Sequence, residues 1–294
     1  MILVTGASGY VGGKALAGLL HQGLPAIGMV RNVDRRGASL PIQAPLRVAD
    51  YDDPASLLRA FDGITTLLFV SSDGAGPDML SHHAHVINAA VAQKISSVVF
   101  TSIIDIDAQS PFYFTPVYSD AERRLSESGL ASTILRCGLY SDLVLNEWIK
   151  PALSTGTLSL PTGAGQIAAI SRDDVALALA TVATSAISHA GKAYELTGPE
   201  SLSLHDFAGI AASALARPLR FVPCSPADFL QRAREEMKDP WPHAYSTLCR
   251  SIAEGRYQRA TDAYEHLTGR APTSFETFVR HVAAEFREGM QPDN

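Results

Sequence analysis

The sequence lacks the marks of several protein classes. Its 294 residues include only three cysteines, Cys137, Cys224 and Cys249, and no CxxC pair. This spacing argues against a disulfide scaffold and against a zinc site. No apolar run approaches the ~20 residues that span a bilayer, and the chain opens into the strand-like MILVTG without a basic leader segment. These absences predict a cytoplasmic protein that has no metal and does not bind a membrane.

The chain also lacks an excess of basic residues. Its 24 Lys and Arg stand against 30 Asp and Glu, which gives a formal net charge of -6 at pH 7. Nucleic acid is therefore not an expected partner, because duplex binding depends on clustered cations. Hydrophobic residues make up 46% of the chain, as in soluble globular proteins. The length suits one large domain, or a main body with a smaller appended lobe.

Up to about residue 137, short apolar runs alternate with segments of helical spacing. The runs are continuous, as in strands buried on both faces, and cover residues 2–5, 26–30, 46–48, 66–70, 97–101 and 132–135. Helices are predicted between them at 11–20, 54–61, 77–92 and 118–128. This βαβα order predicts an α/β fold with a doubly wound parallel sheet, the Rossmann arrangement.

After residue 140 the pattern loosens. We predict a helix over 171–184 that is capped by Ser171, a strand at 193–196, and helices near 203–215, 226–235 and 274–286. Residues 1–140 are expected to form the sheet domain, with 171–190 packing back onto it. Residues 141–294 would form a smaller, discontinuous, helix-rich lobe that binds the substrate.

A glycine-rich turn follows the first predicted strand and opens the first helix. Its pattern is G-x-x-G-x-x-G, and glycine there allows a tight turn whose backbone amides approach a pyrophosphate at the helix N-terminus. The strand before it and the helix after it support a dinucleotide site. The predicted contacts are Gly6, Ala7, Ser8, Gly9, Tyr10, Val11 and Gly12.

The residues after the next strands indicate which dinucleotide binds. Arg31 ends the second strand, where NAD-binding proteins place an acidic residue, and the next carboxylate is Asp34. A guanidinium can pair with a 2′-phosphate, so Arg31 predicts NADPH. Asp50, after the third strand, would either reach the adenine or cap the following helix. The fourth strand ends in three further predicted cofactor contacts, Val70, Ser71 and Ser72.

These stretches together resemble the NmrA-like group of atypical short-chain dehydrogenases, which includes quinone and dye reductases. The matching segments are VTGASGYVGG, VRN, ADYDDPASL, LLFVSS, HVINAA, FTS and LRCGLYSD, in the family's order over residues 1 to about 150. The resemblance implies that Thr101 and Ser102 lie beside the nicotinamide ribose, unless they only cap the strand. It also implies that Gly138 and Leu139 close over the nicotinamide. Tyr140 would form a wall for a planar substrate or pack between the lobes.

One departure from the wider family concerns proton transfer. Ordinary short-chain dehydrogenases use Tyr-x-x-x-Lys, in which the lysine lowers the pKa of the tyrosine. Here Tyr118 is followed four residues later by Glu122, and a neighbouring carboxylate would raise the pKa of the phenol. Alternatively, this helix face packs, with Glu122 paired to a nearby base. Either arrangement favours an acceptor that needs little acid catalysis.

We therefore expect an NADPH-dependent reductase that transfers hydride to a quinone, a dye or another conjugated small molecule, as a monomer or homodimer. Ser102, Tyr118 and Tyr140 are the candidate catalytic residues. The alternatives are a non-catalytic NADP(H) sensor of the NmrA type, and an enoyl or imine reductase that uses Tyr118 or Tyr140 as its proton donor. The cluster of His82, His83 and His85 is not expected to bind metal, because only His83 falls on the apolar stripe of its helix and its two neighbours would be solvated.

Overall fold

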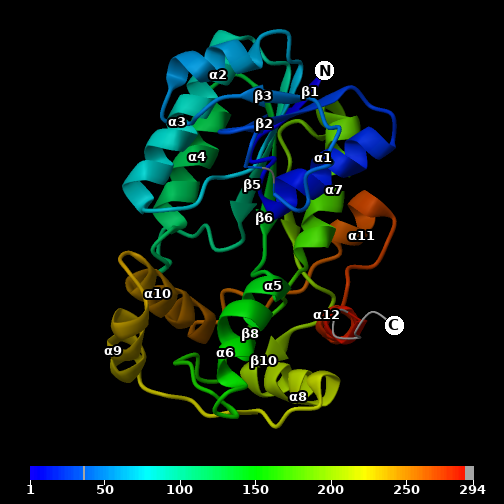
Figure 1. Cartoon of the computed structure of the whole chain (residues 1–294). Coiled ribbons are helices and arrows are strands. Elements are labelled where there is room, and N and C mark those ends of the chain that lie inside the picture. Colours follow the sequence, from blue (N-terminus) through cyan, green and yellow to red (C-terminus); the bar gives the residue numbers. More distant parts are fainter. Residues whose placement is uncertain (36, 289–294) are drawn as a thin grey trace.

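The centre of the molecule is a parallel sheet of seven strands in the order β3-β2-β1-β4-β5-β6-β9 (Figure 1). The computed structural model describes residues 1–35 and 37–288. The strands are β1 (Ile2–Val4), β2 (Ala26–Val30), β3 (Leu46–Val48), β4 (Thr66–Phe69), β5 (Ser97–Ile103), β6 (Ala131–Cys137) and β9 (Ala193–Leu196). Every neighbouring pair is parallel. The strand order reverses between β1 and β4, and ligands of such sheets bind at the carboxyl ends of the strands near that point.

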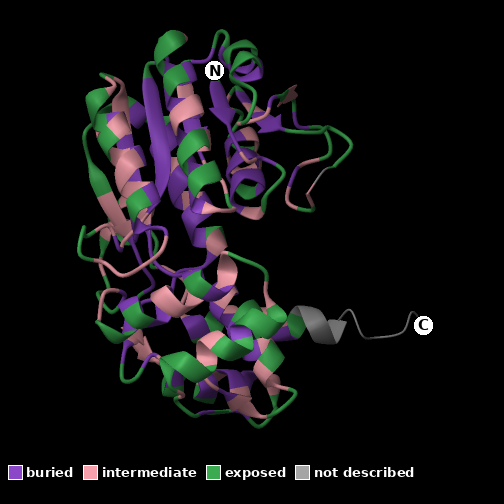
Figure 2. Ribbon diagram, turned by 90° about the vertical axis from the view of Figure 1, so that its left-hand side faces the viewer, coloured by how far each residue is buried: buried purple, intermediate pink, exposed green. Residues whose placement is uncertain are grey.

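Helices cover both faces of the sheet (Figure 1). One face carries α1 (Tyr10–His21), α7 (Arg172–Thr184) and α11 (Ala263–Thr268), and the other carries α2 (Pro54–Phe61), α3 (Gly76–Ala92) and α4 (Thr115–Glu127). Successive residues of a strand point to opposite faces. In β1, Ile2 and Val4 accordingly join the core with α1 and α7, while Leu3 joins the core with α2 and α3. Figure 2, seen from the side of α2, α3 and α4, shows the strands as largely buried and these helices as partly exposed.

Two helix starts agree with their sequence signals. The Asp53 side chain caps α2 by accepting from the backbone N–H groups of Ala55 and Ser56, with proline in the first turn. Ser171 caps α7 by accepting from the N–H of Asp174. The helix predicted from residue 118 begins earlier, at Thr115. The predicted α/β fold with a parallel sheet and a helix-rich C-terminal region is confirmed.

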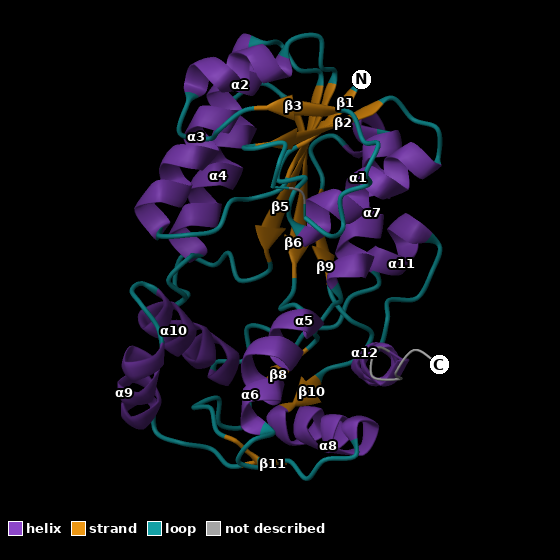
Figure 3. Ribbon diagram, viewed as in Figure 1, coloured by secondary structure: helices purple, strands orange, loops and turns teal. Residues whose placement is uncertain are grey.

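The lobe lies beyond the carboxyl edge of the sheet (Figure 3). Its apolar core includes Trp148, Phe207, Leu248 and Phe275. Its helical elements are α5 (Ser141–Leu143), the π-helix η1 (Val144–Ile149), α6 (Lys150–Ala152), α8 (Leu204–Leu215), α9 (Pro226–Glu236), α10 (Trp241–Ala253) and α12 (Phe275–Glu288). Two short sheets complete it: β7 (Thr157–Leu158) with β11 (Arg220–Phe221), and β8 (Gln166–Ile167) with β10 (Leu202–Ser203).

More of the chain after residue 190 packs with the sheet domain than the sequence predicted. A 3-10 helix, η2 (Ala186–His189), leads from α7 into β9, and both β9 and α11 lie with the sheet although they follow residue 190. The helix α10 was not predicted. Among the described residues, no helix combines the length and the apolar character that crossing a membrane requires.

Candidate functional site

A cavity of about 670 Å³ runs along the carboxyl ends of β1, β2, β4, β5 and β6 and is bounded on the other side by the lobe. The cavity brings together all the site residues predicted from the sequence except Ala7. The predicted residues that line it are Gly6, Ser8, Gly9, Tyr10, Val11, Gly12, Arg31, Asp50, Val70, Ser71, Ser72, Thr101, Ser102, Tyr118, Gly138, Leu139 and Tyr140. The side chain of Ala7 is fully buried, and its backbone N–H donates to the Met29 carbonyl at 3.2 Å. Ala7 therefore packs beneath the turn.

The glycine turn has the geometry of a phosphate cradle. Gly6 has a φ of 59°, in the left-handed region that favours glycine. A Cβ on Gly12 would lie 2.4 Å from the Gly6 carbonyl oxygen, so no other residue fits without a backbone shift. The helix α1 starts after Gly9, and no side chain in the described part of the chain caps it. Its first N–H groups are thus free for an anion.

The end of the cavity near β2 and β3 carries charge. Arg31 is exposed and lines the cavity, and it forms no ion pair with any residue that the structure describes. Asp50 also lines this end, and its carboxylate accepts the N–H of Asp52 at 3.1 Å. Asp50 does not cap α2, because Asp53 does. The capping role considered for Asp50 is therefore wrong, and its carboxylate remains at the cavity.

The three histidines of α3 each make a separate contact. His82 bridges the Ser72 hydroxyl and the Asp52 carboxylate, both at 3.1 Å, and His85 Nδ1 lies 2.7 Å from the Tyr51 carbonyl oxygen. The expectation that these two are solvated is wrong, because α3 packs against the loop after β3 and half-buries both. His83 is fully buried. No group of His, Cys, Asp or Glu within the described ranges is arranged to hold a metal ion.

Glu122 faces the sheet and not Tyr118. It accepts from Arg136 of β6 through Nε at 3.0 Å and Nη2 at 2.6 Å, and from the Ser102 hydroxyl at 2.6 Å. The expectation that Glu122 raises the pKa of Tyr118 is therefore wrong, and the alternative of a carboxylate paired with a base is what the structure has. Because its proton is donated to Glu122, the Ser102 hydroxyl is not directed to a substrate.

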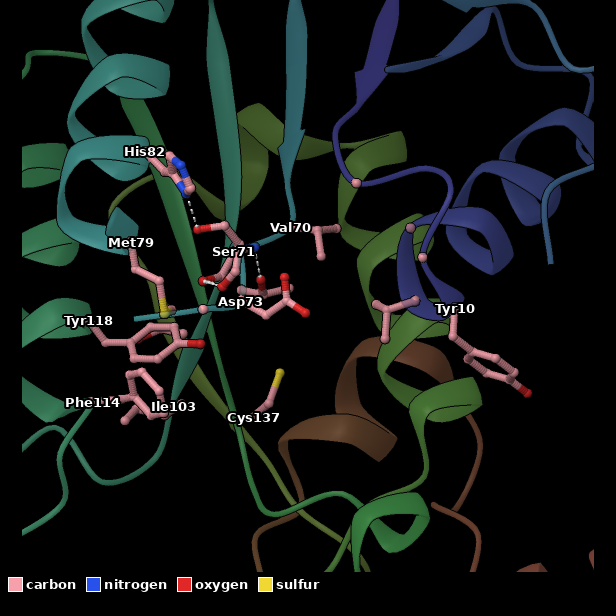
Figure 4. A pocket seen from close by; sticks show the side chains of 18 of the residues that line it. Tyr10, Val70, Ser71, Asp73, Met79, His82, Ile103, Phe114, Tyr118 and Cys137 are labelled. Atoms are coloured by element: carbon pink, nitrogen blue, oxygen red, sulfur yellow. Dashed lines mark hydrogen bonds between the residues drawn. The ribbon is translucent and has the colours of Figure 1, made fainter. Parts of the chain in front are cut away.

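Tyr118 extends from α4 into the cavity. Figure 4 shows its phenol between Met79 and Phe114, directed toward the space between Ser71 and Cys137. Burial raises the pKa of Tyr118, while a hydrogen bond with Ser71 lowers it. Burial likewise raises the pKa of Cys137 to about 12, so this thiol is no nucleophile at neutral pH.

A cation that the sequence reasoning missed lies over the glycine turn. The Arg172 guanidinium lies 4.4 Å from the centre of the Tyr10 ring and pairs with Asp142 at 2.8 Å. The Tyr10 hydroxyl donates to Asp173 at 3.1 Å, and Lys14 pairs with Asp173 at 3.2 Å. These contacts tie the first turn of α7 to the first turn of α1. The only local signal for Arg172 was its place beside the cap of α7.

The opposite end of the cavity is aromatic. Tyr140 lines it from the β6 loop, and the pKa of its phenol is raised well above the ordinary value by burial. Sequence reasoning missed the rest of this wall, which comes from the loop before α4 and from α10 and its C-terminal loop: Phe112, Phe114, Trp241, Ala244, Tyr245, Leu248 and Tyr257. The buried Asp105 fixes α10 to the β5 loop by accepting from Ser110 and Ser251. The available signal was the helical spacing of Ala244, Leu248 and Ile252.

Comparisons with known proteins agree with this geometry. Residues 6–186 match a family model described as NAD(P)H-binding. Quinone oxidoreductase 2 of Escherichia coli is 34% identical over 232 residues, which cover 78% of this chain and 79% of that protein. An NmrA-like family domain-containing oxidoreductase of Aspergillus flavus is 25% identical over 301 residues, covering 97% of this chain and 96% of that protein.

Two solved structures with bound cofactor have the same fold. The E. coli quinone oxidoreductase complexed with NADPH superposes with a TM-score of 0.88 at 29% identity, covering 96% of this chain and 99% of that chain. The triphenylmethane reductase of Citrobacter sp. complexed with NADP(H) gives 0.87 at 25% identity, covering 96% and 100%. The resemblance drawn from the motifs and the nicotinamide dinucleotide cofactor are thereby confirmed.

Proposed function

We propose that this chain, which belongs to the NAD(P)H-binding family, is an NADPH-dependent reductase of quinones, cationic dyes or similar conjugated acceptors. The observation that carries the proposal is the continuity of the cavity, which joins a glycine turn at one end to an aromatic enclosure at the other. A protein that only sensed the cofactor would not need the second compartment.

The residues along the cavity suit NADPH in an extended conformation. The glycine turn and the N-terminus of α1 offer N–H groups to the pyrophosphate, with Arg172 beside them as a second positive group. Arg31 offers a guanidinium to the 2′-phosphate. The nicotinamide would then lie at the ends of β5 and β6, near Thr101 and Gly138.

The acceptor end selects for flat molecules. Trp241 and Tyr245 of α10 face the cavity opposite the β6 loop with Tyr140, and aromatic walls favour stacking with planar rings. A quinone or a triarylmethane cation is already electron-poor, so bound NADPH supplies the hydride and the protein mainly aligns the two rings and excludes water. An unactivated ketone would need a proton donor with a lowered pKa, and Glu122, paired with Arg136, does not provide the lysine that lowers the tyrosine pKa in ordinary short-chain dehydrogenases.

Steady-state assays test this function directly. Purified protein is mixed with NADPH and, in turn, menadione, a cationic triarylmethane dye, an azo dye and an enone, and the loss of NADPH absorbance is followed together with product analysis. We expect turnover of at least the quinone or the dye. Tight NADPH binding without turnover of any acceptor would refute the proposal and favour the sensor.

The cellular setting belongs to the same proposal. Cys137, Cys224 and Cys249 are all free thiols, and free cysteines are typical of a reducing compartment. We therefore propose that the enzyme acts in the cytoplasm on a diffusible small molecule.

A further inference from the structure

The half-buried Ser71 and the fully buried His83 form a pair beside Tyr118. Ser71 Oγ is 2.9 Å from His83 Nε2 and 3.0 Å from the Ser72 carbonyl oxygen. The Ser71 backbone N–H donates to Thr101 Oγ1 at 2.8 Å, which fixes the end of β4 against β5. Ser71 and Tyr118 both line the cavity, the Tyr118 phenol is directed toward the space between Ser71 and Cys137 (Figure 4), and the centres of the Tyr118 and His83 rings are 5.9 Å apart. One hydroxyl group thus lies between the cavity tyrosine and a buried imidazole.

The environment of His83 keeps its ring neutral. The ring is fully buried and packs against Phe69 and Phe100, each with ring centres 5.5 Å away. This burial lowers the pKa of His83 to about 4, so the ring is neutral at pH 7. Ser71 has a single hydroxyl proton, which it donates to the Ser72 carbonyl. With that proton on the Ser72 carbonyl, Ser71 Oγ is the acceptor for His83 Nε2–H, and His83 Nδ1 has no hydrogen-bond partner among the described residues.

This hydrogen-bond arrangement leaves the Ser71 proton free to change its acceptor. His83 holds the Ser71 oxygen as an acceptor, so the O–H bond can rotate from the Ser72 carbonyl to a stronger acceptor. A phenolate at Tyr118 would be such an acceptor, because hydrogen bonds to charged groups are stronger than those to neutral groups.

We propose that Ser71, oriented by His83, is a positioning residue for proton transfer from Tyr118 to the reduced acceptor. The inference rests on the proposed reductase function. A quinone that has received hydride from NADPH is a hydroquinone anion, and Tyr118 gives its phenol proton to the anionic oxygen. The Tyr118 O–H bond breaks, an O–H bond forms on the product, and the Ser71 hydroxyl turns to the phenolate. After the product leaves, a water molecule protonates the Tyr118 phenolate and departs as hydroxide. His83 stays neutral throughout.

Two acceptors with different proton needs test the proposal. Quinone reduction requires one hydride and one proton, whereas a triarylmethane cation becomes the neutral product by taking hydride alone. At saturating NADPH, Tyr118→Phe should lower kcat for menadione about 100-fold, as the loss of a general acid does. Ser71→Ala should lower it about tenfold, as the loss of a hydrogen bond to a charged group does. Both substitutions should lower kcat for the dye much less than kcat for menadione, because the dye needs no proton.

Matched variants separate positioning from folding. Ser81→Ala removes an exposed hydroxyl from α3, the helix that carries His83, and should change kcat for neither acceptor. His83→Leu should act like Ser71→Ala, and His83→Gln, which keeps an N–H donor, should recover part of the loss. Thermal melts establish that each variant is folded. Because Ser71→Ala leaves His83 in the core, this variant tests the positioning role even if His83→Leu does not fold.

The outcomes distinguish this inference from the function on which it rests. Equal losses of kcat with quinone and dye would mean that Ser71 has only a structural role and would overturn the inference. An unchanged kcat for the quinone in both Ser71→Ala and Tyr118→Phe would also overturn it. If the wild type reduces only the quinone, its kcat should fall in D₂O and that isotope effect should vanish in Tyr118→Phe; an isotope effect that persists there overturns the inference. If the wild type reduces neither acceptor, the proposed function itself fails.

Discussion

Replacement of Arg31 by alanine should weaken NADPH binding and leave NADH binding unchanged. The guanidinium lines the cavity at the end of β2 and pairs with no described carboxylate, so it is available for the 2′-phosphate that NADH lacks. Asp50 and Asp52 line the same end. Without Arg31, the repulsion between these carboxylates and the phosphate would no longer be offset by its guanidinium.

The size of the loss in NADPH affinity depends on how exposed the Arg31 side chain is. A hydrogen bond to a charged group contributes about 1.5–3 kcal/mol, which corresponds to roughly 10- to 150-fold in affinity. Because Arg31 is exposed, we expect the lower end, about tenfold in Kd. The ratio of the two affinities should also shrink as salt is added, since ions screen exposed charges over about 8–10 Å.

Isothermal titration calorimetry with NADPH and with NADH measures both affinities for the wild type and the variant. Arg35→Ala is the matched control, because Arg35 is an exposed arginine of the same loop that does not line the cavity. A parallel loss of NADPH and NADH affinity in Arg31→Ala would refute the reasoning, and so would an unchanged preference for NADPH.

Three further predictions concern the turn, the aromatic wall and the buried histidine. Gly12→Ala should weaken both cofactors at least tenfold in calorimetry, because its Cβ would meet the Gly6 carbonyl at 2.4 Å and displace the cradle. Trp241→Ala should raise KM for menadione about tenfold, through loss of ring stacking, without changing Kd for NADPH. The free energy of unfolding, from urea titrations, should fall by about 3 kcal/mol between pH 6.5 and pH 4, because unfolded His83 takes up a proton there while the buried ring, with its pKa of about 4, does not. A His83→Gln chain should lack that part of the pH dependence, and a slope equal to that of the wild type would contradict the assignment.

The sheet could be predicted because its signals are local. Each strand is a continuous apolar run, and each crossover helix carries its own cap, such as Asp53 or Ser171. The glycine turn is also a local signal, since the steric demand at Gly12 arises from Gly6 only six residues away. Cofactor binding could therefore be predicted from one short segment and its flanking elements.

The acceptor end could not be predicted in the same way. The backbone N–H of Tyr113, in the loop before α4, donates to the Thr247 hydroxyl of α10 at 3.1 Å, across 134 residues of sequence. Trp241 reaches the cavity only because α10 is anchored on the sheet domain in this way. No periodicity within either segment specifies that they meet, so the aromatic wall depends on tertiary packing.

The missing lysine illustrates why a motif read alone can mislead. Four residues after Tyr118 the helix α4 faces Arg136, with which Glu122 forms a two-point ion pair that also binds Ser102. A lysine at position 122 would therefore stand beside a guanidinium and would lose the pair that fixes α4 to β6, so restoring the motif would not restore its chemistry. The support for the Tyr118 phenol comes instead from the opposite side, from Ser71 at the end of β4. The site keeps the tyrosine of the motif but assigns its support to a different strand.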